Sequence, residues 1–162
     1  MNPYKKLFRA FDKEKVRYLI VGGVAVNLYG YNRTTGDIDV LLALEKNNLE
    51  KVAMIMDRLG YTERLPVGLK ELRDKKKVKK WIKEKGMTAY TFISSKKPQL
   101  DLDILVDYSF SFKKYFDKRA FIEIWDMKVP VVSFNDLVSM KKKAGRDKDL
   151  LDVKALLELK TL

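Results

Sequence analysis

Helical and strand-like patterns of apolar residues alternate along the first part of the chain. Three apolar residues recur at helical spacing within residues 4–14, which predicts an amphipathic helix. Residues 17–21, an arginine followed by four apolar residues, predict a short buried strand. Gly22 and Gly23 end this strand, and residues 24–29 predict a short apolar helix directly behind them. The two glycines are therefore expected at a helix N-terminus.

A second strand and a third helix follow. Residues 38–42 alternate and then become continuously apolar, which is typical of a strand at the centre of a sheet. Asn47 or Asn48 is a suitable cap for a helix that reaches Leu59, with Gly60 as its stop signal. This part of the chain thus predicts the order helix, strand, helix, strand, helix.

The second half of the chain predicts two pairs of strands. Residues 87–93 and 100–106 are rich in β-forming residues and are separated by a turn that contains proline, which indicates a hairpin. Residues 121–125 and 127–132 predict a second pair of short strands. Pro130 lacks a backbone donor, so it places the second of these strands at a sheet edge or places the proline at a strand end.

The C-terminal segment predicts two helices. Ser133 precedes Asp136 by three residues, as in a capping box, and a break near Gly145 divides the remainder. No internal repeat, low-complexity tract or linker interrupts the chain. We therefore expect residues 1–162 to form a single domain of the α+β class, with a mixed sheet flanked by helices.

Composition narrows the chemistry that this domain can perform. The 162 residues are 46% hydrophobic, enough for a continuous core, and they include neither cysteine nor histidine. Disulfides, thiolate zinc sites, thiol nucleophiles and a histidine general base are therefore excluded. Catalysis would depend on carboxylates, lysine, tyrosine or hydroxyl groups, and carboxylates with a hard metal ion fit this set best.

Charge and hydropathy indicate location and partners. The chain carries 34 Lys and Arg against 22 Asp and Glu, a net charge of +12, which favours nucleotide or nucleic-acid partners. A Lys/Glu-rich surface of the kind found in heat-adapted proteins is the alternative explanation of the charge.

Residues 1–11 contain no signal-peptide core. The longest apolar stretch, residues 18–31, is interrupted by glycines and falls short of the about 20 residues that span a bilayer. We expect a cytoplasmic protein without a membrane partner.

The central motif is Gly22-Gly23 followed, after thirteen residues, by Asp37-Ile-Asp39. Residues i and i+2 of a strand point to one face, so both carboxylates project together, roughly 7 Å apart along the backbone. The glycines allow close approach of a ligand to the backbone, and the helix behind them adds a positive dipole end, which suits a triphosphate. Alone, a Gly-Gly pair is usually a turn and alternating aspartates usually face solvent. Here the rest of the strand is apolar. Burying two acidic side chains in such a strand costs free energy unless they are paired or bound to a metal.

These motifs resemble the nucleotidyltransferase superfamily that shares the polymerase-beta fold. Its signature of apolar-Gly-Gly, an acidic-apolar-acidic triplet and a later acidic residue between apolar neighbours is matched by residues 21–23, 37–39 and 100–104. The chain looks closest to the stand-alone branch that includes AbiEii-type toxin enzymes. Residues 22–25, 29–33, 35–39 and the segment 141–152 carry that likeness, which is weakest at residues 61–97.

The resemblance implies a two-metal mechanism with carboxylate ligands. Asp37 and Asp39 would hold two Mg²⁺ ions, with Mn²⁺ as an alternative ion, and a third carboxylate would complete the metal that binds the acceptor. Asp101 and Asp103 share a strand face and are both available for this role. Asp103 is favoured because it lies deeper in its strand.

Further residues are expected at the triphosphate. Arg33 and Thr35 lie just before the acidic triplet, and a guanidinium can hold phosphate through two bonds; a surface loop arginine is the plainer interpretation. Lys141 is a further expected contact to the triphosphate. The neighbouring charged residues are expected to form ion pairs on the helix instead; they are Arg146, Lys148, Asp149 and Asp152.

Residues 70–85 hold nine cations and three anions. Such a run is usually a solvated helix face or loop, but beside a nucleotidyltransferase site it is suited to the backbone of an RNA acceptor. The sequence thus predicts transfer from a nucleoside triphosphate, ATP among them, to an RNA end, a protein or a small molecule. A non-catalytic nucleotide- or RNA-binding module, as one half of a toxin–antitoxin pair, is the alternative.

Overall fold

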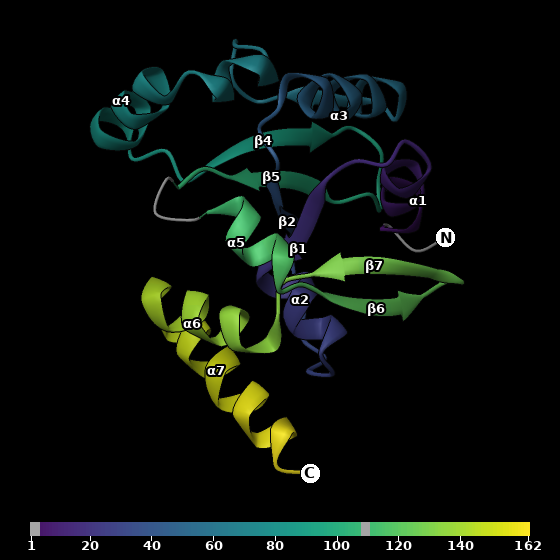
Figure 1. Ribbon diagram of the computed structural model, residues 1–162, viewed down its shortest axis with the longest axis vertical. Helices are drawn as coiled ribbons and strands as arrows, with labels where there is room; N and C mark the ends of the chain where they lie inside the picture. Colours follow the sequence, from purple (N-terminus) through teal and green to yellow (C-terminus); the bar gives the residue numbers. More distant parts are fainter. Residues whose placement is uncertain (1–3, 108–110) are drawn as a thin grey trace.

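The computed structural model describes residues 4–107 and 111–162 (Figure 1). The elements of these residues are, in chain order, α1 (Lys5–Lys13), β1 (Tyr18–Val21), α2 (Gly22–Leu28), β2 (Asp37–Leu42), α3 (Lys46–Arg58), β3 (Tyr61–Glu63), the 3-10 helix η1 (Leu69–Arg73), α4 (Lys75–Lys85), β4 (Ala89–Ser94), β5 (Asp101–Leu105), α5 (Phe112–Asp117), β6 (Ala120–Ile124), β7 (Met127–Val131), α6 (Phe134–Ala144) and α7 (Asp147–Lys160). No helix in this part of the chain is long and apolar enough to span a bilayer.

The seven strands form one mixed sheet in the order β3-β4-β5-β2-β1-β7-β6. β1 is antiparallel to β2, whereas β2 and β5 are parallel. The predicted hairpin is confirmed as the antiparallel pair β4 and β5, and the second predicted pair is confirmed as β6 and β7. The expected α+β class with a mixed sheet and flanking helices is therefore confirmed.

The alternative that Pro130 marks an edge strand is wrong. β7 pairs with β6 on one side and with β1 on the other, so it is an inner strand of the sheet. Pro130 is instead the residue before the last of β7. The missing donor of proline is tolerated there because the pairing to β1 involves only the end of the strand, where Val131 faces Ile20.

The two faces of the central strands differ in exposure: one is buried and the other is half-exposed. On β2, Ile38 and Val40 are buried, and on β5 the same holds for Leu102 and Ile104. Their sequence neighbours on the other face are aspartates of intermediate exposure. Figure 1 shows α3 and α4 on one side of the molecule, beside β4, and α6 and α7 at the opposite end. The acidic residues therefore belong to a sheet whose centre is anchored by its apolar face.

Some elements had no predicted counterpart. The basic segment forms η1 and then α4, which begins after Asp74 and ends at Gly86. The Asp74 side chain accepts a bond from the backbone N–H of Lys77, and Gly86 has a positive φ of 61°, so both ends carry ordinary helix signals. The short strand β3 and helix α5 were also not predicted.

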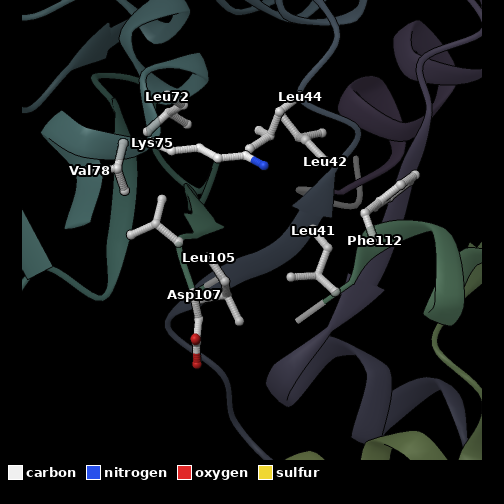
Figure 2. Close-up of a pocket in the computed structure, with 10 residues that line it drawn as sticks. Leu41, Leu42, Leu44, Leu72, Lys75, Val78, Leu105, Asp107 and Phe112 are labelled. Carbon is white, nitrogen blue, oxygen red and sulfur yellow. The ribbon is translucent and has the colours of Figure 1, made fainter. Parts of the chain in front are cut away.

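A mainly apolar cavity of about 300 Å³ lies at the carboxyl ends of β2 and β5 (Figure 2). Leu41 and Leu105 line it from the strands, and Leu72 and Val78 line it from η1 and α4. In Figure 2 the side chain of Lys75 extends across this space. None of the aspartates of β2 and β5 lines this cavity, so it is separate from them.

Candidate active site

Three carboxylates meet at the centre of the sheet. Asp37 and Asp39 come from β2 and Asp103 from the parallel neighbour β5, in a register that sets Asp39 opposite Asp103. One carboxylate oxygen from each of the three residues lies within 4.8 Å of the other two. All three side chains are partly exposed, so a ligand can reach them from solvent. We call these residues the carboxylate cluster.

Asp101 lies outside the carboxylate cluster. It faces Asp37 across the strand pair, but its carboxylate accepts a 2.8 Å hydrogen bond from the backbone N–H of Ser94 in the hairpin. Its other oxygen lies 4.0 Å from a guanidinium nitrogen of Arg64. Asp101 therefore supports the hairpin, whereas the structure places Asp103, the residue favoured from the sequence, beside Asp37 and Asp39.

The cluster concentrates negative charge in a partly buried place. The pKa of Asp39 is raised to about 7, first by burial and then by the charges of Asp37 and Asp103, while the charges of Lys141 and Lys148 oppose the shift. Burial also raises the pKa of Asp103, although the Thr91 hydroxyl donates a 2.6 Å hydrogen bond that favours its charged form. The carboxylates thus lie in an arrangement that a cation would stabilise.

The glycine pair lets the carboxylate cluster lie against the start of α2. Gly22 has a φ of 63°, and a Cβ at this position would lie 2.1 Å from Oδ2 of Asp39. A Cβ on Gly23 would lie 2.6 Å from Oγ1 of Thr35 and 3.0 Å from a guanidinium nitrogen of Arg33. The space beside Gly23 is therefore filled by side chains of the protein. The expected contact of the glycine backbone with a triphosphate stays a prediction.

The loop before β2 is held rigidly beside α2. The backbone N–H of Arg33 donates to the Asn27 side chain at 3.1 Å, and the Thr35 hydroxyl donates to the carbonyl of Asp37 at 3.2 Å. These bonds place Arg33 and Thr35, both expected at the triphosphate, next to the glycine pair. Their hydrogen bonds within the protein fix the first residue of β2.

A network of ion pairs joins this loop to the C-terminal helices. The guanidinium of Arg33 pairs with the carboxylate of Asp152: Nη2 donates a 2.9 Å hydrogen bond to Oδ2, and Nε lies 2.8 Å from Oδ1. The ammonium group of Lys141 lies 3.0 Å from Asp152 and 3.1 Å from Asp149, and Arg146 lies 2.6 Å from Asp149. Three members of the expected ion-pair group, Arg146, Asp149 and Asp152, do form ion pairs. Lys148 forms none with the residues that the structure describes, and Arg33 and Lys141 take part instead. We call the five paired residues the ion-pair network.

Sequence reasoning missed two neighbours of the carboxylate cluster. Thr91 on β4 lies opposite Asp103, and only the strand register reveals this. A cavity of about 480 Å³ also reaches Asp103 from the side of β4 and α4. The indole of Trp81 lines this cavity, together with Arg64 and Lys85. A tryptophan within a lysine-rich helix was the sole sequence signal for it.

The sequence matches the model of the family described as nucleotidyltransferase of unknown function (DUF6036) over residues 4–160. The chain belongs to this nucleotidyltransferase family. Membership agrees with the order of its motifs, the glycine pair followed by the acidic triplet of β2 and the later aspartate of β5. A search of curated proteins gave no match.

Solved structures share the fold of this family member. The crystal structure of the lincosamide antibiotic adenylyltransferase LnuA, lincomycin-bound, is similar with a TM-score of 0.64 and 19% identity, covering 96% of each chain. ANT(2″)-Ia in complex with adenylyl-2″-tobramycin has a TM-score of 0.56 and 15% identity, with 94% of this chain and 84% of that chain covered. An antigenic nucleotidyltransferase-like protein from Paracoccidioides brasiliensis has a TM-score of 0.59 and 16% identity, with 94% and 72% covered. At these identities the likeness shows the fold.

Proposed function

We propose that this protein is a metal-dependent nucleotidyltransferase that moves a nucleoside monophosphate from a nucleoside triphosphate to a hydroxyl acceptor. The observation that carries this proposal is the carboxylate cluster, in which Asp37, Asp39 and Asp103 bring oxygens within 4.8 Å of one another. Membership of a nucleotidyltransferase family supports the reaction class. ATP is the first triphosphate to test, because LnuA is an adenylyltransferase and ANT(2″)-Ia is seen with an adenylylated compound.

The donor set of the carboxylate cluster fits a hard divalent cation. Three carboxylates converge from two adjacent strands, and oxygen is the ligand atom that Mg²⁺ and Mn²⁺ prefer. We propose that Asp37 and Asp39 hold two Mg²⁺ ions and that Asp103 completes the ion on the acceptor side. Bound Mg²⁺ would neutralise charge on the triphosphate and make the acceptor hydroxyl more acidic.

The triphosphate is proposed to lie between the carboxylate cluster and the C-terminal helices. Lys141 and Lys148 are close enough to lower the pKa of Asp39, so positive charge is present on that side. Lys141 and Arg33 are themselves paired with aspartates, so their proposed contribution is to hold α6, α7 and the loop in place beside the phosphates. Gly22 and Gly23 leave room for Asp39, Thr35 and Arg33 against the start of α2 because neither carries a side chain. The backbone of this pair is proposed to lie beside the phosphates.

Transfer requires a simple exchange of bonds. The acceptor oxygen bonds to the α-phosphorus of the triphosphate, the bond from that phosphorus to the bridging oxygen breaks, and pyrophosphate leaves. The hydroxyl proton passes to water. The protein's contribution is to position the two reactants in line and to keep its carboxylates fixed, which is how phosphoryl transfer is generally accelerated.

Two matched aspartates on β5 test the proposal. Asp103→Asn is expected to reduce pyrophosphate release with Mg²⁺ and triphosphate at least about 100-fold, because even outer-shell partners of metal ligands are worth about 10- to 100-fold. Asp101→Asn, two residues away and bonded to Ser94, should retain most activity. Equal losses in both variants would contradict the assignment, as would binding of triphosphate without release across RNA, protein and small-molecule acceptors, which would indicate a non-catalytic module.

From the resemblance of the sequence to AbiEii-type enzymes we also propose a biological role, that of a toxin. If the chain is the toxin of a toxin–antitoxin pair, its expression should arrest growth through the carboxylate cluster. Asp37→Asn should then restore growth at equal protein levels. Arrest that persists in the Asp37→Asn variant would remove the toxin role and leave the enzymatic proposal intact.

A further inference from the structure

A pocket of about 480 Å³ opens beside Asp103, between β4 and α4. Its volume falls within the range of about 300 to 1,000 Å³ that small-molecule sites occupy. We call it the Trp81 pocket, after its aromatic wall. Its lining includes Arg64, Val67, Trp81, Lys85, Met87 and Asp103.

The Trp81 pocket reaches the carboxylate cluster from the side opposite the proposed triphosphate position. In the sheet, β5 lies between β2 and β4, so the pocket adjoins Asp103 on its β4 side. The glycine pair and the ion-pair network belong to α2, the loop before β2 and the C-terminal helices, and none of these elements lines the pocket. A molecule in the pocket would therefore meet a triphosphate at the carboxylates without competing for its space.

The walls of the pocket select an aromatic, anionic occupant. Trp81 and Met87 form apolar surface, and an indole face stacks well on any nucleobase. Arg64 and Lys85 contribute two cations, while Asp103 is the proposed metal ligand. A polycationic acceptor would face these two cations and the lysines of α4, so the charge pattern favours phosphate instead.

We infer that the Trp81 pocket binds the acceptor as a nucleotide, with its base on Trp81, its phosphate at Arg64 and Lys85, and its ribose hydroxyl directed toward Asp103. The inference rests on the proposed function and names its substrate class. The ribose oxygen then forms the bond to the α-phosphorus of the triphosphate, pyrophosphate leaves, and the hydroxyl proton passes to water. A free nucleotide and the terminal nucleotide of an RNA strand share this chemistry.

Fluorescence of Trp81 measures occupation of the pocket directly. The chain has two tryptophans, so Trp125→Phe leaves Trp81 as the sole tryptophan, which is excited selectively at wavelengths that tyrosine does not absorb. This variant is titrated without triphosphate, first with AMP and then with a short single-stranded RNA. Saturable quenching is expected for both, because a base stacks on the indole.

A pair of charge-matched variants tests the phosphate contacts. Arg64→Gln combined with Lys85→Gln should weaken AMP binding about tenfold, roughly the sum of two exposed ion pairs. Lys76→Gln combined with Lys83→Gln removes the same charge from exposed positions of α4 that do not line the pocket, and should change AMP affinity less than about twofold. Absence of quenching by AMP and RNA, or equal weakening in both variants, overturns the inference.

The same assay distinguishes a free nucleotide from the terminal nucleotide of an RNA strand. If the acceptor is an RNA end, the RNA should bind at least about tenfold more tightly than AMP, and its affinity should fall log-linearly with salt through the lysines of α4. Equal affinities with little dependence on salt assign the pocket to a free nucleotide.

Transfer assays distinguish failure of this inference from failure of the proposed function. The pocket variant should raise KM for the nucleotide acceptor while the KM for the triphosphate stays unchanged. Transfer that depends on Asp37 but occurs without any response of Trp81 overturns the pocket and leaves the proposed function standing. Quenching by nucleotide without transfer from any triphosphate overturns the acceptor role together with the proposed function, and leaves a nucleotide-binding pocket.

Discussion

At the scale of single residues, the site places like charges close together against the backbone of a glycine. Asp39 has a carboxylate oxygen within 4.8 Å of those of Asp37 and Asp103, and its side chain lies against Gly22 at the start of α2. Its pKa of about 7 lies well above the value of about 3.9 expected in the unfolded chain. The folded protein therefore binds this proton more tightly than the unfolded chain does. The contribution of Asp39 to the free energy of unfolding is largest below about pH 4 and is lost as pH rises to about 7.

We expect Asp39→Asn to stabilise the metal-free protein at about pH 8 and to abolish its stabilisation by Mg²⁺. The gain should be a few degrees in Tm, because about 1 kcal/mol shifts the midpoint of a domain of this size by about 2–4 °C. Near pH 5 the difference from wild type should shrink, because Asp39 is then protonated in the folded protein. Melting curves in EDTA and in Mg²⁺ at both pH values measure this. A variant that melts below wild type at pH 8 would contradict the electrostatic account.

Two glycines with similar backbone angles provide a second residue-scale test. Gly22 and Gly86 have φ values of 63° and 61°, but a Cβ would collide with Asp39 only at the first, and nothing lies within 4 Å at the second. Gly86→Ala should cost about 1–2 kcal/mol of backbone strain. Gly22→Ala should cost more and should also displace Asp39, so Mg²⁺ would no longer raise Tm. Equal costs, with Mg²⁺ binding retained in both variants, would show that Asp39 moves aside freely.

At the scale of elements, the ion-pair network ties α6 and α7 to the loop before β2. Arg33 and Asp152 are 119 positions apart in the chain, yet their side chains form an ion pair with one hydrogen bond, from Nη2 of Arg33. Lys141 on α6 shares Asp152 and also contacts Asp149 on α7. The carboxylates of this network are almost fully buried. Removal of one charged side chain leaves the buried charges of its partners unpaired and away from water, which lowers the free energy of unfolding.

Asp152→Asn is therefore expected to lower the free energy of unfolding by about 3–5 kcal/mol. Triphosphate affinity should fall as well, because Arg33 loses the partner that holds the loop. The matched control is Asp147→Asn, an exposed aspartate in the first turn of α7, which should cost less than about 1 kcal/mol. Urea denaturation and calorimetric titration of triphosphate measure the two effects. Similar stability in the two variants would show that the network adds little to the fold.

At the scale of the whole molecule, the carboxylate cluster joins strands whose hydrogen bonding defines the sheet. β2 and β5 are parallel neighbours at its centre, so a ligand bound to both depends on the complete fold. The net charge of +12 favours anionic ligands over the entire surface. Ligand binding at such a site should stabilise the domain as one unit.

Mg²⁺ together with its triphosphate is expected to raise Tm by about 5–10 °C at a concentration near 100 times Kd, since this corresponds to about 2.7 kcal/mol. Mg²⁺ alone or triphosphate alone should raise Tm less, because the positive charge of Mg²⁺ offsets the negative charge of the triphosphate when both are bound. A thermal-shift series over the four common triphosphates, with and without Mg²⁺, measures this and ranks the nucleotides. No shift with any triphosphate would contradict a nucleotide site at the carboxylate cluster.

The sequence alone determined the local features of this protein. Most strands and helices follow from apolar periodicity and cap residues, since these depend on neighbours within four positions. The projection of Asp37 and Asp39 to one face follows from the period of a strand in the same way. The position of β7 and the course of residues 61–85 were not determined, because pairing partners and isolated apolar residues within a basic segment have no local signature.

Only the tertiary structure decided which distant residues meet. Parallel pairing of β5 with β2 brings Asp103 to Asp39 and leaves Asp101 bonded to the hairpin, a choice that alternation alone leaves open. The same holds for the contact of Arg33 with Asp152 and for the cavity that Trp81 and Asp103 both line. Such contacts depend on how faces of different elements pack and on strand register, which no window of adjacent residues contains.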